Sequence, residues 1–296
     1  MLACESHMAT VGDSGGVGRV SAAVRVDGEL RSIATDFPAH SVFPIYSITK
    51  TLTAICVLRL VETGSLRLAD AARHWLPDVR LPSTVTLTHL LRHTGGLRDY
   101  GPLREYHDAV RAHPDRPWTR QQFLDAVLAK GMLFAPGERF SYSNIGYMLL
   151  IDIVERVTSQ TFADVIHDFI SRPLDLQHTS VLERVDDLMR CVPGFGPEVT
   201  SDGQVVDVRG RYHPGWCAPR LVASTVEDVT RVFDRLIAGD VLEPDTLGHM
   251  KPRASTAVDR HAQIIALWMG CSSYQRSAEV VVPFWGPMRI ACCGMS

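Results

Sequence analysis

Residues 47–63 constrain the fold most, because this segment has the pattern of a helix that is apolar on most of its faces. Such a helix is stable only where other elements cover it, so the pattern predicts a central helix inside a larger domain. Gly64 follows directly, and glycine is the residue type that most often ends a helix. With 296 residues, the chain is long enough to bury a helix of this kind.

Short β-rich runs lie near both ends of the chain. Near the amino terminus, residues 20–26 and 30–34 are joined by Asp27-Gly28, a favourable hairpin turn. Near the carboxyl terminus, residues 264–269 and 279–282 have strand-like patterns. The spacing predicts an antiparallel sheet with strands from both chain ends.

Helical patterns dominate from residue 66 to about residue 213. A capping box, Ser224-Thr225-Val226-Glu227, then predicts a helix through Ile237 that ends at Gly239. The expected fold is therefore α+β, with helices flanking the sheet. We assign residues 1–70 and 222–296 to the sheet region and residues 71–221 to a large, mostly helical insertion.

Composition excludes several classes of function. The net charge is −3 with acids and bases interspersed, which gives no basic surface for nucleic acid. We find no apolar run long enough to span a bilayer and no secretory signal pattern at the amino terminus. The seven cysteines lack regular spacing and favour reduced thiols, so we expect a cytoplasmic protein with no nucleic-acid or membrane partner.

Ser47 and Lys50 form the first candidate catalytic pair. At the start of a helix, residues three apart lie on the same face, so Lys50 is within reach of Ser47. A desolvated lysine loses ammonium character and can take the proton of a serine that attacks a carbonyl. The alternative is an N-cap serine beside a solvated lysine, which a lone S-x-x-K pattern favours over catalysis.

A second group, Tyr142-Ser143-Asn144, contains the only asparagine in the chain. A phenol near a lysine can pass protons to a leaving group, and an amide can hold the lysine and a substrate carbonyl. Tyr142 as a buried aromatic with a satisfied hydroxyl remains the alternative. The two groups together favour catalysis over either structural interpretation.

These residues carry a resemblance to a known family. The chain resembles the serine β-lactamase and penicillin-binding protein superfamily, in its class C branch with related esterases and D-amino-acid peptidases. Ser47-Ile48-Thr49-Lys50 is similar to its S-x-x-K motif and Tyr142-Ser143-Asn144 to its Y-x-N motif. The stretches at 86–97 and 134–150 are also similar to segments of that branch.

The resemblance implies a β-lactamase/transpeptidase-like fold and a two-step acyl transfer without metal or other cofactor. Ser47 would be the nucleophile, with Lys50 and Tyr142 moving protons and Asn144 positioning the substrate. The backbone N–H of Ser47 would serve as one oxyanion donor. His93 and Gly95 would shape the site wall. Expected substrates are small esters, amides or lactams.

The family's third motif, K-T-G or H-x-G, is not found after Ile237, so the closing strands are expected to be incomplete. A shifted reading frame at residues 283–286 would permit His-Ser-Gly-Gly, and a divergent tail is the alternative. We therefore predict an esterase-like serine hydrolase. The alternatives are a β-lactamase or D-alanyl (D-amino-acid) peptidase, and an inactive relic that lacks the third motif.

Two other patterns are interpreted as non-functional. Gly12-Asp13-Ser14-Gly15-Gly16 is similar to a protease nucleophile segment, but too few residues precede it to present a histidine and an aspartate. His89 and His93 have a spacing that can bind one metal, yet no third ligand is evident. We expect no metal site.

Overall fold

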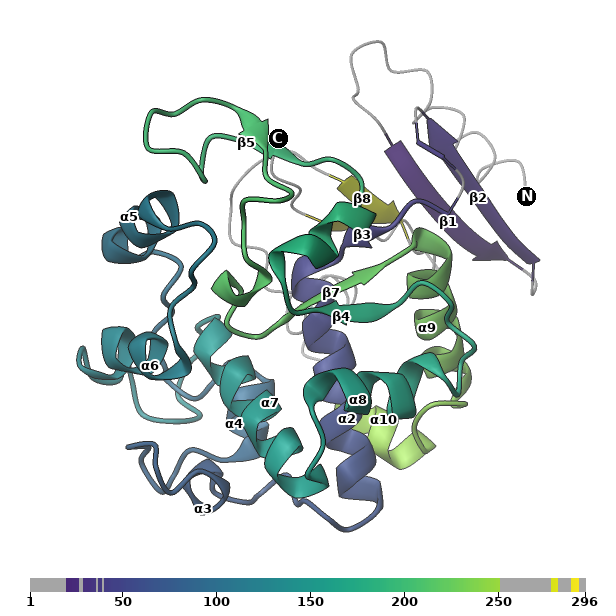
Figure 1. Ribbon diagram of the computed structural model, residues 1–296. Helices are drawn as coiled ribbons and strands as arrows, with labels where there is room; N and C mark the ends of the chain where they lie inside the picture. The colour runs from purple at the N-terminus through teal and green to yellow at the C-terminus, as the bar shows by residue number, and fades with distance from the viewer. Residues whose placement is uncertain are drawn as a thin grey trace.

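The computed structural model of the chain describes residues 20–26, 29–35, 37–38, 40–250, 278–281 and 289–292. Helix α2 (Thr49–Glu62) runs through the centre of the described fold (Figure 1). Most of its residues are buried, from Thr49 to Leu58 and at Leu60. Gly64 follows with a φ of +73°, a conformation that glycine adopts without strain. The predicted central helix is thus confirmed, preceded by a 3₁₀ turn, η1 (Tyr46–Ile48).

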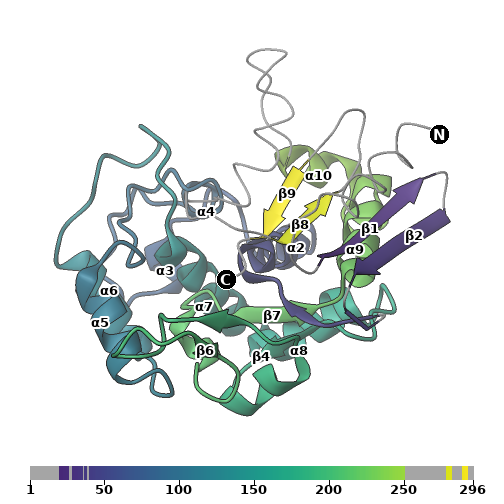
Figure 2. The same cartoon turned by 90° about the horizontal axis from the view of Figure 1, so that it is seen from above.

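Strands from the two ends of the chain lie side by side (Figure 2). Strand β1 (Val20–Val26) pairs antiparallel with β2 (Glu29–Thr35), as predicted. Strand β8 (Ala278–Val281) pairs antiparallel with β9 (Arg289–Cys292). In the described ranges β8 contacts β1 and β9 contacts η1, but each hydrogen-bonded ladder stays within its own hairpin.

Strand β9 was not predicted, because the tail from residue 286 shows no clear alternation. The predicted strand at 279–282 corresponds to β8. The predicted strand at 264–269, Ser14 and the motif position at 283–286 lie outside the described residues.

A second sheet lies beside the start of α2. It has the order β3 (Phe43–Pro44), β7 (Leu221–Ser224), β4 (Ser180–Leu182), and both pairings are antiparallel. The Ile45 N–H donates to the Val222 carbonyl at 2.8 Å, which continues the edge of this sheet towards η1. A further small hairpin joins β5 (Phe195–Gly196) to β6 (Val206–Asp207).

Helices and short helical turns make up most of the remaining described chain, and none of the described helices is long and apolar enough to cross a membrane. They are α3 (Ala72–Trp75), α4 (Leu87–Leu91), α5 (Arg104–Ala112), α6 (Arg120–Leu128), α7 (Asn144–Thr158), α8 (Phe162–Ile166), η2 (His167–Ser171), η3 (Val185–Arg190), η4 (Pro214–Trp216), α9 (Val226–Ala238) and α10 (Pro244–Met250).

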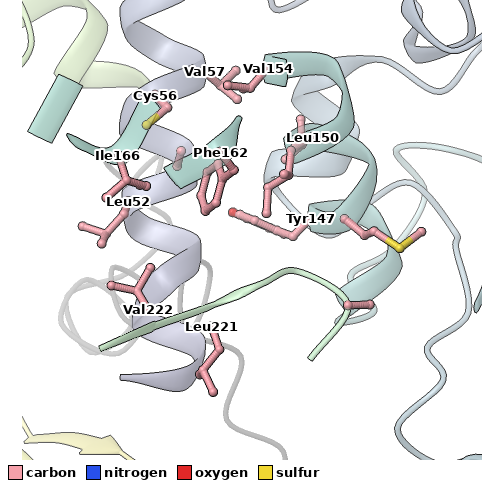
Figure 3. Packing of buried hydrophobic residues seen from close by; sticks show 14 of the residues in the cluster. Leu52, Cys56, Val57, Tyr147, Leu150, Val154, Phe162, Ile166, Leu221 and Val222 are labelled. Carbon is pink, nitrogen blue, oxygen red and sulfur yellow. The ribbon is translucent and has the colours of Figure 1, made fainter. Parts of the chain in front are cut away.

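The core is built around α2, α7, α8 and β7 (Figure 3). Leu52 and Val57 of α2, Leu150 of α7 and Phe162 of α8 are all nearly inaccessible to solvent. The ring of Tyr147 points into the same cluster, and its hydroxyl donates to the Leu91 carbonyl at 3.0 Å. Burial of these side chains stabilises the region that carries the first turns of α2 and α7.

The predicted capping box at the start of α9 is wrong by one residue. Thr225 is the cap, and its hydroxyl accepts a hydrogen bond from the Asp228 N–H at 3.1 Å. Ser224 instead ends β7, where its hydroxyl lies 2.7 Å from that of Thr179. Strand β7 was not predicted from the sequence, and it includes Ser224 as its last residue. Gly239, with a φ of +85°, ends the helix as predicted.

Candidate active site

Ser47 lies in η1, directly before the first turn of α2. The preceding residue, Tyr46, has a φ of +39°, a strained value for a residue with a side chain. Thr49 fixes the turn from the other side, because its hydroxyl accepts the Val222 N–H of β7 at 3.2 Å. The nucleophile candidate is therefore held between a strained turn and a buried strand.

Three of the predicted residues meet at the Ser47 hydroxyl. Its Oγ lies 2.8 Å from the Tyr142 hydroxyl and 3.3 Å from Lys50 Nζ. Lys50 Nζ also lies 5.0 Å from the centre of the Tyr142 ring, over its face. The Ser47 hydroxyl is therefore within hydrogen-bond distance of both groups that could act on its proton.

Asn144, the first residue of α7, extends this network. The Tyr142 hydroxyl donates to Asn144 Oδ1 at 3.3 Å. The side chain of Ser143 caps α7 by accepting the Gly146 N–H at 3.3 Å. The cap orients the first turn of the helix so that Asn144 lies beside Tyr142.

Asp99 is a site residue that the sequence reasoning missed. Its carboxylate accepts the backbone N–H of Asn144 at 3.0 Å and the side-chain Nδ2–H at 2.9 Å. The two residues are 45 positions apart, and no spacing rule connects them. The one feature of the sequence that could have pointed to Asp99 is its position shortly after Gly95-Gly96.

Burial dominates the electrostatics of Lys50. The side chain is almost wholly inaccessible, and the resulting desolvation lowers its pKa to about 8. The nearby Asp99 carboxylate acts in the opposite direction and raises the pKa. A lysine with this pKa is neutral in an appreciable fraction of molecules near neutral pH and can act as a base.

His93 is buried against the aromatic side chains of the site. Its ring centre lies 4.6 Å from that of Tyr142 and 5.0 Å from that of Tyr147. Nδ1 accepts the Ser143 N–H at 3.1 Å, so the ring proton sits on Nε2. Desolvation, with a smaller contribution from Lys50, lowers the pKa of His93 to about 3. The imidazole is therefore neutral and packs against the general-base candidates without adding charge.

Gly95 is not part of the hydrogen-bonded network. A Cβ at this position would meet Leu90, Val85 and the His89 carbonyl at ordinary contact distances. Its neighbour Gly96 has the stricter requirement, with a φ of +73° and a Cβ position only 2.2 Å from the Phe134 carbonyl oxygen. Gly96 lets the segment after His93 pass close to the chain at residue 134.

The two histidines with metal-like spacing have separate partners. His89 Nδ1 accepts the Thr86 N–H at 3.2 Å and completes the cap of α4, while His93 contacts Ser143. Across the described part of the chain, no group of three or more histidine, cysteine, aspartate or glutamate side chains is arranged to hold a metal.

Comparison with known proteins gives a consistent result. A family model described as Beta-lactamase matches residues 5–275. Penicillin-binding protein 4 of Amycolatopsis lactamdurans is 30% identical over 237 residues, which are 75% of this chain and 60% of that protein. The D-alanyl-D-alanine-carboxypeptidase/endopeptidase AmpH of Escherichia coli (strain K12) is 28% identical over 184 residues, 57% of this chain and 47% of that protein.

A solved structure of a D-stereospecific amidohydrolase from Streptomyces sp. shares the fold. Its TM-score is 0.69 at 23% identity, with 79% of this chain and 72% of that chain covered. The chain spans less than two thirds of the length of the curated relatives that it matches.

Proposed function

Because the chain belongs to the Beta-lactamase family, we propose that it is a serine hydrolase that cleaves a small ester or amide through an acyl-enzyme at Ser47. The observation that carries the proposal is the position of the Ser47 hydroxyl, 2.8 Å from the Tyr142 hydroxyl and 3.3 Å from buried Lys50. An N-cap serine beside a solvated lysine does not account for a lysine with so little exposure.

In the first step, Ser47 Oγ forms a bond to the substrate carbonyl carbon. Its proton passes to neutral Lys50, either directly or through Tyr142, which takes the Ser47 proton as it gives its own phenolic proton to Lys50. The carbonyl oxygen takes the negative charge. The backbone N–H of Ser47, at the amino-terminal end of α2, is the proposed donor to that oxygen. The bond to the leaving oxygen or nitrogen then breaks as Tyr142 donates a proton to it.

In the second step, water attacks the acyl carbon and breaks its bond to Ser47. The same groups take the proton of the water and return one to Ser47 Oγ, which regenerates the free enzyme. The positions of Tyr142 and Lys50, both within hydrogen-bond distance of Ser47 Oγ, support this exchange in both directions.

For the substrate, we propose a small ester or amide of a cytoplasmic metabolite. Supporting this compartment, Cys56, Cys191 and Cys217 are unpaired thiols in the described part of the chain. A D-amino-acid amide, a D-alanyl peptide or a β-lactam is the second candidate, supported by what the names of the amidohydrolase and the carboxypeptidase state of those proteins.

A fluorophosphonate probe with intact-mass analysis tests the mechanism. We expect one adduct per chain, absent in Ser47→Ala. Ser143→Ala is a matched control because Ser143 lies beside the site but serves as a helix cap. An adduct that persists in Ser47→Ala contradicts the proposal, and so does a wild-type chain that folds but stays unlabelled.

A substrate panel tests the specificity. Short p-nitrophenyl esters, D-amino-acid amides, D-alanyl-D-alanine peptides and nitrocefin are compared by kcat/KM. We expect the esters to be cleaved fastest. A higher kcat/KM for the D-amino-acid amides or D-alanyl peptides would establish the second candidate, and one for nitrocefin would establish lactam hydrolysis.

A further inference from the structure

The Asn144 side-chain amide has one orientation that satisfies all of its neighbours. The Asp99 carboxylate accepts two hydrogen bonds from Asn144, one from the backbone N–H at 3.0 Å and one from the side-chain Nδ2 at 2.9 Å. A carboxylate only accepts hydrogen bonds, so the amide must turn its nitrogen towards Asp99. Its oxygen, Oδ1, is thereby turned to the Tyr142 hydroxyl at 3.3 Å.

This orientation sets the direction of the hydrogen bonds at Tyr142. A phenol has one proton, and here it is donated to Asn144 Oδ1. The Tyr142 oxygen is then the acceptor in its 2.8 Å contact with Ser47, and Ser47 is the donor. The proton of the nucleophile therefore points at Tyr142 before the reaction begins.

We propose that Asp99 is a positioning residue, which fixes the Asn144 amide and through it makes Tyr142 the hydrogen-bond acceptor of the Ser47 hydroxyl. The inference rests on the proposed function for its catalytic consequence, while the hold of Asp99 on Asn144 is measurable without any activity. Asp99 contacts no reacting atom and acts through Asn144.

The same carboxylate also acts on Lys50 through its charge. The titratable groups that face or influence Lys50 are Asp99, Cys217, His93, Tyr142 and Tyr147. Among the causes of the Lys50 pKa, Asp99 raises it and burial lowers it more strongly. Removal of the Asp99 charge therefore lowers the pKa of Lys50 further and extends its neutral form to lower pH.

Asp99→Asn separates these effects from simple loss of packing. The new amide has one acceptor and one donor group where the carboxylate had two acceptors. If its oxygen accepts the Asn144 N–H, its nitrogen faces Nδ2 of Asn144, and two donors meet. Rotation of the Asn144 side-chain amide by about 180° removes this clash between donors. The rotated amide then presents an N–H to Tyr142 in place of its oxygen.

The first test uses the fact that Asn144 is the only asparagine in the chain. Labelling with [¹⁵N]asparagine gives one side-chain NH₂ signal by NMR. We expect the chemical shift of one of its two protons to be moved downfield by the Asp99 carboxylate. This downfield shift should disappear at acid pH, where Asp99 is protonated, and in Asp99→Ala. Two protons with ordinary shifts, unchanged by pH down to the onset of unfolding, would overturn the inference.

The second test measures the rate of Ser47 phosphonylation against pH in the wild type, Asp99→Asn and Asp152→Asn. Asp152 is a matched control, since it is a partly buried carboxylate on α7 that pairs with Arg120. We expect Asp99→Asn to lower the plateau rate on the order of tenfold and to move the rise in rate to lower pH. Asp152→Asn should leave both unchanged.

A wild-type plateau and an unshifted pH profile in Asp99→Asn would overturn the inference while leaving the proposed function intact. A wild-type chain that does not react with the probe would overturn the proposed function. In that case the NMR measurement still decides whether Asp99 holds Asn144.

Discussion

Ser47 Oγ lies 2.8 Å from the Tyr142 hydroxyl, although 95 residues separate the two in the chain. The contact joins the turn before α2 to the start of α7, and the two helices pack against each other in the core (Figure 3). The geometry of this pair therefore depends on helix packing as well as on the two motifs.

Replacement of Tyr142 by phenylalanine should separate chemistry from packing. The variant keeps the ring, which packs 4.6 Å from His93, but loses the hydroxyl contacts to Ser47 and Asn144. We expect phosphonylation of Ser47 to slow by about a hundredfold, as removal of a general acid–base group does. The free energy of unfolding, from urea titration, should fall by about 1 kcal/mol or less. An unchanged rate would remove Tyr142 from the mechanism.

The lowered pKa of Lys50 determines the pH dependence that we expect for the reaction. The base must be neutral, and burial lowers the pKa of Lys50 to about 8. The phosphonylation rate should therefore be low at pH 6, rise through pH 8 and level off above it. Stopped-flow or quenched labelling from pH 5.5 to 10 gives the profile.

Variants of the same lysine provide the control for that profile. Lys50→Ala should flatten the rise near pH 8 and lower the plateau by about a hundredfold or more. Lys130→Ala is the matched control, because Lys130 is an exposed lysine that pairs with Glu105. A rise near pH 8 that survives in Lys50→Ala would assign the titration to another group.

The parts of the site that could be predicted from sequence are those set by local geometry. Ser47 and Lys50 are one helical turn apart, and the start of a buried helix brings them together with no information from elsewhere. Tyr142 and Asn144 were found because their residue types match an acid–base role. Each inference needed only a short stretch of sequence.

The parts that were missed depend on contacts between distant segments. Asp99 holds Asn144 from a loop 45 residues earlier, and no pattern within either segment records that contact. The cap of α9 shifted from Ser224 to Thr225 because β7 extends through Ser224, which pairs with Phe43 of β3. Strand β9 forms against β8 despite a sequence without alternation, so its pairing partner decides its conformation.

His93 should make the protein less stable in acid. Its pKa is lowered from 6.5 to about 3 in the folded chain, so below pH 6.5 the unfolded chain binds a proton that the folded chain does not. Stability is therefore full above pH 6.5 and falls as the pH drops towards 3. Between pH 7 and pH 4 this one group should cost about 3 kcal/mol.

His93→Gln provides the comparison, since glutamine can accept the Ser143 N–H but does not titrate in this range. Urea unfolding of both proteins at pH 7 and pH 4 gives the difference. We expect the acid-induced loss of stability to be smaller in the variant by about 3 kcal/mol. Equal losses in the two proteins would show that His93 is protonated in the folded chain or exposed to solvent.

Gly96 and Gly64 form a matched pair for testing how the segment after His93 is held. Both have a φ of +73°, so alanine at either position is strained to a similar degree, by about 1 kcal/mol. No atom lies within 4 Å of a Cβ at Gly64, whereas a Cβ at Gly96 would lie 2.2 Å from the Phe134 carbonyl oxygen. Gly64→Ala should therefore reduce the free energy of unfolding by about 1 kcal/mol, and Gly96→Ala by about 3 kcal/mol or more.

Because Gly96 lies between His93 and Asp99, Gly96→Ala should also slow phosphonylation of Ser47, which Gly64→Ala should leave unchanged. Equal effects of the two substitutions on stability would mean that the chain at residue 134 does not approach Gly96 as closely as the structure shows.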